Sequence, residues 1–146
     1  MHQEQLKIHV FRLKPGQDLK KEIEAYVYNE KMEAGWIITC VGSLSQLHLK
    51  FANQFHGTEL NGHFEIVSLV GTLSINGCHL HISISDGKGK TTGGHLLAGN
   101  LIYTTAEIVI GESRHLVFTR EKDGTTDWEE LQVTKKPFNT DPNALE

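Results

Sequence analysis

Cysteine is scarce in this sequence: its 146 residues include only Cys40 and Cys78, with no C-x-x-C pair. Cys40 lies in an apolar run and Cys78 beside an alternating segment, which favours a reducing compartment. No apolar run approaches the ~20 residues needed to cross a bilayer, and the first residues lack the apolar core of a signal peptide. We therefore expect a cytoplasmic protein without a membrane-spanning segment.

Positive charge is also in short supply. Lys and Arg number 14 against 18 Asp and Glu, which gives a formal net charge of −4. A domain that binds nucleic acid by neutralising phosphates carries the opposite sign. The densest basic stretches, 20–21 and 88–90, are short and have acidic neighbours, as a solvated surface does. Direct DNA binding is therefore not expected, although a local basic patch stays open.

The length and composition fit one globular domain. Apolar residues make up 38% and charged residues 22%, and the 14 glycines indicate many turns. We find no internal repeat and no second domain. The sequence predicts a single domain over residues 1–136, followed by a flexible tail over residues 137–146, which shows no hydrophobic periodicity.

The hydrophobic pattern predicts one helix and many short strands. Asp18 is the expected N-cap of a helix that runs to about Glu33, and Gly35 is the expected glycine after its end. Asn76-Gly77 is the strongest hairpin signal. The strand candidates are 6–13, 36–41, 47–51, 64–70, 72–75, 80–84, 101–110, 116–119 and 128–133. This order predicts an α+β fold with a curved, mostly antiparallel, barrel-like sheet and one main helix packed on it.

The clearest chemical pattern lies in the segment 78–86. Its apolar side chains alternate strictly with polar ones, so His79 and His81 share one face of a strand. Alternate residues on a strand lie roughly 6.5 to 7 Å apart, which lets two imidazoles converge on one ion. Gly93-Gly94 precedes His95, and paired glycines can adopt conformations closed to other residues and return that side chain to the sheet. The pattern predicts a divalent transition metal held by His79, His81 and His95.

The metal and its chemistry are less defined by the pattern. Zinc is the first choice for three imidazoles, with iron or nickel as alternatives. Three neutral imidazoles leave a tetrahedral ion one open position, as in catalytic zinc sites. The alternative is a histidine cluster hydrogen-bonded with Ser83, Ser85 and Asp86, which binds an anion or lies at a subunit interface.

Two acidic residues are further candidates. Glu65 lies within a predicted strand, where it is a candidate hydrogen-bond partner of a ligand histidine or a general base; the alternative is a solvent-facing carboxylate. Glu107 shares a predicted strand face with Tyr103 and Thr105, a stripe that lines either a pocket or a plain surface. No Gly-x-Ser-x-Gly elbow is present and Cys40 is apolar in context, so an enzyme built on a nucleophile is disfavoured.

Four segments in fixed order resemble the plants-and-prokaryotes-conserved (PPC) domain family over about residues 6–133. They are 34–44, 62–72, 79–86 and 93–99, the last running into 103–107. The resemblance implies a small α+β fold, a curved antiparallel sheet with short flanking helical segments, and a homotrimer. Stand-alone bacterial members carry the three histidines, which implies that His79, His81 and His95 are metal ligands. His63 departs from the family, whose members usually carry Arg or Pro there.

The resemblance leaves two functions open. One is a trimeric metal-binding protein that senses a ligand or performs an undefined metal-assisted reaction. The other is a non-catalytic oligomeric interaction module that presents surfaces to protein partners and associates with DNA through them. Family members are often labelled DNA-binding proteins, and in plants the domain follows AT-hook motifs. This chain has no AT-hook, which argues against direct DNA binding.

Overall fold

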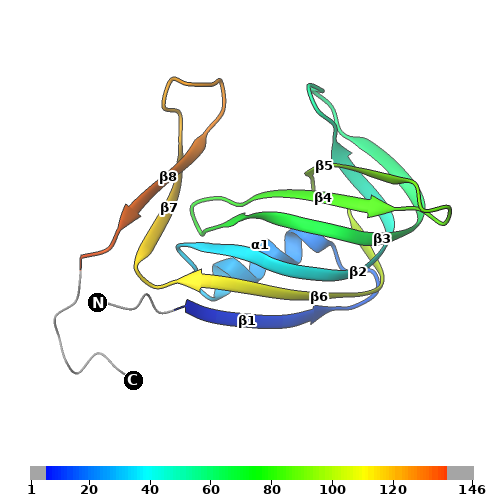
Figure 1. Ribbon diagram of the computed structural model, residues 1–146, viewed down its shortest axis with the longest axis horizontal. Coiled ribbons are helices and arrows are strands. Elements are labelled where there is room, and N and C mark those ends of the chain that lie inside the picture. The colour runs from blue at the N-terminus through cyan, green and yellow to red at the C-terminus, as the bar shows by residue number, and fades with distance from the viewer. Residues whose placement is uncertain (1–5, 138–146) are drawn as a thin grey trace.

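Eight strands and one helix make up residues 6–137, the part of the chain that the computed structural model describes (Figure 1). In chain order they are β1 (Leu6–Leu13), α1 (Leu19–Asn29), β2 (Gly35–Lys50), β3 (Thr58–Leu73), β4 (His79–Ser85), β5 (Thr91–Leu96), β6 (Leu101–Ser113), β7 (Leu116–Glu121) and β8 (Glu130–Lys135). The short flanking helical segments that the resemblance implied are not among these elements. The predicted tail from residue 138 onward lies outside the described residues.

Six strands form one curved antiparallel sheet in the order β1-β6-β2-β3-β4-β5. The end of β2 also pairs with β5, through Leu49 with Leu96 and Lys50 with His95. Strands β2 to β5 therefore close on themselves, which confirms the predicted curved, barrel-like sheet. β7 and β8 form a separate two-stranded hairpin that leans away from the main sheet (Figure 1).

The helix begins as predicted and ends early. Asp18 accepts hydrogen bonds from the backbone N–H groups of Lys20 and Lys21, as an N-cap does. The helix ends at Asn29 rather than near Glu33, and Lys31 takes the left-handed conformation with φ 52°. Gly35 is the first residue of β2 and not a helix-ending glycine. A larger residue would be crowded at this position, because its Cβ would lie 3.2 Å from the Gly111 carbonyl.

Two strands are longer than the sequence pattern predicted. β2 joins the predicted segment 36–41 with residues 47–50 of the next one, and β3 joins 64–70 with residues 72–73 of the next one. A register shift between Leu44 and Gln46 interrupts the alternation of β2, so that one strand has the pattern of two. The predicted hairpin at Asn76-Gly77 is confirmed between β3 and β4, where the Gly77 N–H donates to the Ser74 carbonyl at 3.0 Å.

One part of the core lies between α1 and the inner side of the sheet. The rest is enclosed by strands β2 to β5. Its fully buried large side chains are Leu19, Ile23, Met32, Leu44, Leu47, Leu49, Leu73, Leu80, Ile84, Leu96, Ile102 and Ile108. Among the described residues, no helix is long and apolar enough to cross a membrane.

One histidine is part of this interior. His9 is 4% exposed, and its two ring nitrogens lie 3.0 Å from the Tyr26 hydroxyl and 2.8 Å from a Glu112 carboxylate oxygen. Burial is the first cause that raises the pKa of Tyr26. These contacts give His9 a structural role at the junction of β1, α1 and β6.

Candidate metal centre

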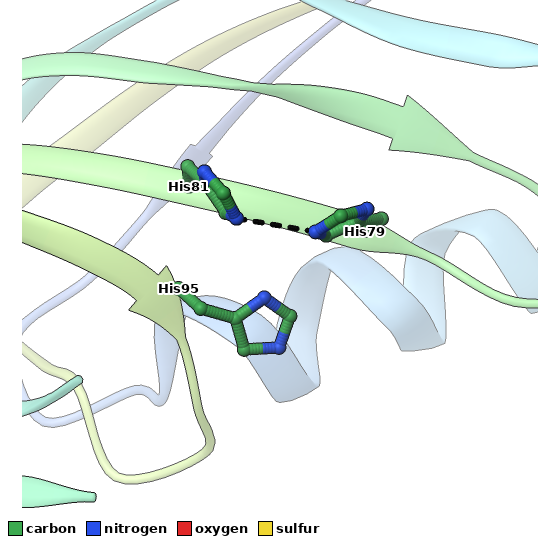
Figure 2. Close-up of side chains that lie close together, drawn as sticks. All are labelled: His79, His81 and His95. Carbon is green, nitrogen blue, oxygen red and sulfur yellow. Dashed lines mark hydrogen bonds between the residues drawn. The ribbon is translucent and has the colours of Figure 1, made fainter. Parts of the chain in front are cut away.

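The predicted alternation of β4 places two histidines on its outer face. Leu80 and Ile82 are buried at 1% and 3% exposure, while His79 and His81 are exposed on the opposite side. His95 lies near the end of β5, directly across from His81 in the antiparallel pair. Directly opposite residues of adjacent strands point to the same side of a sheet. The strand register therefore brings the three rings together (Figure 2).

The three rings are close enough to share one ion. His79, His81 and His95 each offer one ring nitrogen, and these nitrogens lie within 4.8 Å of one another. The two Nε2 atoms of His79 and His81 are 3.1 Å apart. Zn–N bonds of about 2.0 to 2.1 Å in a tetrahedron imply nitrogens roughly 3.3 Å apart. The group fits a transition metal after small side-chain movements, and its imidazole donors are those that zinc, iron and nickel accept.

Gly93 and Gly94 position His95 by their small size. Neither glycine has a left-handed backbone, so the predicted reason for the pair, unusual backbone conformation, is wrong. A Cβ on Gly93 would collide with the Ile82 carbonyl of β4, and one on Gly94 would lie 2.6 Å from the Lys50 carbonyl of β2. The two glycines let β5 fit between β4 and β2.

The environment of two of the rings, His79 and His95, favours their neutral form. Burial, followed by the charges of His79 and His81, lowers the pKa of His95 from 6.5 to about 4. Burial, followed by Arg120 and His81, also lowers the pKa of His79. Metals bind the deprotonated imidazole, so near neutral pH these two rings are in the form that binds a metal.

A cation that the sequence pattern did not reveal lies against the triad. The Arg120 side chain comes from β7; its Nη1 lies 3.4 Å from His79 Nδ1, and its Nη2 donates to Thr72 Oγ1 at 2.7 Å. On the other side, Lys50 is in register with His95, and its Nζ lies 4.7 Å from the centre of the Trp128 ring. These contacts join segments far apart in sequence, so no local pattern indicates them.

The other candidates lie elsewhere. In the strand register Glu65 lies opposite Ser85 of β4. Ser85 is four residues along β4 from His81, so about 13 Å of strand separates Glu65 from the triad. The Asp86 carboxylate accepts from the N–H groups of Lys88 and Lys90 in the turn after β4, which occupies it away from the triad. Glu107 is a residue of β6 and lies opposite Arg12 of β1 in the strand register.

The stripe that contains Glu107 lies on β6, outside the closed strands β2 to β5. Thr105 Oγ1 accepts from Arg12 Nε at 2.9 Å, and the exposed Tyr103 ring stacks on His63 at 4.3 Å between centroids. This aromatic pair is a surface feature, separate from the three histidines.

We expect Gly94→Ala to disturb the triad, because the new Cβ must push β5 away from the Lys50 carbonyl. The loss of stability should be about 1 to 3 kcal/mol, as for other overpacked sites. Chemical denaturation measures the loss, and NMR contacts between the His81 and His95 rings report the register. Gly87→Ala is the matched control, since a Cβ there meets nothing within 4 Å. Equal effects of the two substitutions would contradict the role of Gly94.

The lowered pKa of His95 predicts a pH effect on the metal-free protein. As the pH falls from 6.5 to about 4, the unfolded chain takes up this proton before the folded chain does, so the folded state loses stability. His95→Gln removes this loss, and its Tm should therefore gain on that of the wild type as the pH falls. Thermal unfolding in chelator measures the difference, with exposed His56→Gln as control. A pH-independent difference would contradict the shift.

Comparison with known proteins identifies the family. Residues 2–114 match the model of the Plants and Prokaryotes Conserved (PCC) domain, the family abbreviated PPC above. The chain is similar to a hypothetical protein from Salmonella cholerae-suis, with 37% identity over 93% of this chain and 99% of that one and a TM-score of 0.90. A plant- and prokaryote-conserved protein from Pyrococcus horikoshii has 26% identity, covers 90% and 98% of the two chains, and gives a TM-score of 0.69.

Two further matches differ in kind. A metal-containing protein from Archaeoglobus fulgidus shares the fold, with 23% identity over 90% of this chain and 99% of that one and a TM-score of 0.75. The bifunctional protein GlmU of Synechococcus sp. (strain JA-3-3Ab) is 43% identical over 138 residues, 94% of this chain. The chain spans only 22% of that relative's length. Together, the family match and the fold show that the chain belongs to the Plants and Prokaryotes Conserved domain family.

Proposed function

We propose that this protein is a trimeric metal-binding protein in which His79, His81 and His95 hold one divalent transition metal. Zinc is the first choice, with iron or nickel as alternatives. The observation that carries the proposal is the convergence of three ring nitrogens within 4.8 Å, from two adjacent strands. The metal-containing relative of the same fold from Archaeoglobus fulgidus is in keeping with it.

The three imidazoles leave room for a fourth ligand. When bound, a divalent ion at such a site supplies Lewis-acid polarisation of an oxygen ligand. Glu65 is too distant along the sheet to act as a base at the triad. The site therefore suits the binding or sensing of a ligand first, and a metal-assisted reaction second.

An exposed apolar surface supports self-association. Leu6, Ile8 and Val10 follow one another on the outer face of β1 and are 49%, 51% and 70% exposed. β1 is also the edge of the main sheet, where unpaired backbone groups invite another chain. Apolar surface of this kind marks interaction sites, and a trimer of cytoplasmic chains would cover it.

The second candidate function is an interaction module without catalysis. It is favoured by the match to GlmU. This chain corresponds to only 22% of that longer protein, as expected of a module that can be joined to other segments. In this case the same apolar surface of β1 would bind a protein partner, and any association with DNA would come through that partner.

Metal analysis tests the first proposal. Protein purified without chelator and without a histidine tag should contain near one metal per chain. The double variant His79→Ala/His81→Ala should lose it, because one imidazole cannot hold the ion. The matched control is His56→Ala/His63→Ala, which removes two exposed histidines outside the triad. Folded protein that carries no metal and gains none from zinc or iron salts would overturn the metal site.

The trimer has its own test. Val10→Asp places a charge on the exposed stripe of β1 and should lower the mass measured by light scattering from three chains toward one. Phe55→Asp is the control, since Phe55 is 91% exposed in the loop between β2 and β3. A single-chain mass for the unmodified protein would contradict the trimer, whatever its metal content.

A further inference from the structure

The β7–β8 hairpin lies beyond residues 2–114, the part that the family model matches. It is nevertheless firmly attached to the domain through Phe118, whose side chain is 8% exposed. The Phe118 carbonyl accepts from Ser74 Oγ and Asn76 Nδ2, both at 2.9 Å, and its N–H donates to the Glu33 carbonyl at 2.9 Å. The hairpin is therefore anchored on the turn between β3 and β4.

This anchor aims Arg120 at the triad. Arg120 lies two residues after Phe118 on β7, and its stem runs past Gly77, where a Cβ would lie 3.1 Å from Arg120 Cγ. The Nη2 donates to Thr72 Oγ1 at 2.7 Å, and Thr72 is the residue directly across β3 from His79. The guanidinium is held in one place, with Nη1 at 3.4 Å from His79 Nδ1.

The contact between Arg120 and His79 has a different chemistry when His79 is a metal ligand. The His79 Nε2 is the atom that lies 3.1 Å from His81 Nε2, so it is the nitrogen that faces a shared ion. The Nδ1 of a ring bound through Nε2 carries a proton and donates, and a guanidinium can only donate. Ligand histidines usually donate this second N–H to a carboxylate or carbonyl. Here two donors meet, and an oxygen acceptor beside them would satisfy both.

Positive charge continues around the triad. Lys50 is in register with His95 at the opposite end, and its ammonium lies over Trp128, a residue of the same hairpin loop. Of the acidic groups nearby, Glu130 of β8 accepts from Thr126 Oγ1 at 2.5 Å, and Glu24 lies 3.6 Å from Lys20 on α1. The hairpin thus adds the Arg120 cation and holds the Lys50 cation beside the three rings, while its own Glu130 carboxylate also acts on His79.

We propose that the β7–β8 hairpin makes the triad a binding site for a small oxyanion, a carboxylate or phosphate group, which Arg120 binds and Lys50 supports. The planar guanidinium matches the oxygens of both groups with two parallel hydrogen bonds. This inference deepens the proposed function: it rests on the metal site for the proton on His79 Nδ1 that the anion would accept, whereas the Arg120 contact itself needs no metal.

Calorimetric titration tests the inference. Inorganic phosphate and malonate are titrated separately into zinc-loaded protein freed of excess metal and into metal-free protein. Arg120→Gln should weaken binding of the preferred anion by about tenfold or more, the loss expected for a charged hydrogen-bonding partner. Its metal content should stay that of the wild type. Arg114→Gln, which removes an exposed arginine between β6 and β7, should leave the affinity unchanged.

Arg120→Lys keeps the positive charge and removes the planar guanidinium that can form two parallel hydrogen bonds. It should retain part of the phosphate affinity and lose more of the malonate affinity, because a lysine acts as a point charge. The two anions therefore distinguish a phosphate-bearing from a carboxylate-bearing ligand.

The outcomes separate this inference from the metal site. Full metal content together with anion binding that ignores Arg120, or with no anion binding at all, overturns the inference and leaves the metal site standing. Protein that takes no metal yet binds an anion through Arg120 supports the anion site and overturns the metal proposal.

Discussion

The candidate metal centre depends on the fit of β5 between β4 and β2. Gly93 faces the Ile82 carbonyl and Gly94 faces the Lys50 carbonyl, each at a separation that leaves no room for a Cβ. This fit closes the strands on themselves and sets the register in which His81, His95 and Lys50 lie side by side. A slip of one residue would turn His95 toward the core and Leu96 toward the solvent.

The same closure sets the electrostatics of the site. Burial lowers the pKa values of His79 and His95, and neighbouring charges add to it: Arg120 and His81 for His79, and His79 and His81 for His95. In the described structure the Nε2 atoms of His79 and His81 share a hydrogen bond at 3.1 Å. One proton between two lone pairs is a weak substitute for a cation, which could accept both.

The sequence predicted the part of this arrangement that is local. Strict alternation in β4 determines the face of His79 and His81, and the helix N-cap at Asp18 follows from short-range hydrogen bonds. His95 was predicted on the wrong ground, since its glycines provide close approach rather than a rare backbone. Glu65 shares a strand face with the triad but lies at another register position, which depends on strand pairing that no single segment specifies.

Arg120 could not be predicted for a related reason. It meets His79 across 41 residues of sequence, through a hairpin whose own pattern does not indicate this contact. The family match ends before that hairpin, at residue 114, whereas all three histidines lie within it. The three rings are therefore a feature of the shared domain, whereas the Arg120 cation beside His79 comes from a segment outside the match. A relative with the same three histidines and a different hairpin would keep the cluster and lack the Arg120 contact, so the surroundings of the triad do not transfer with the fold.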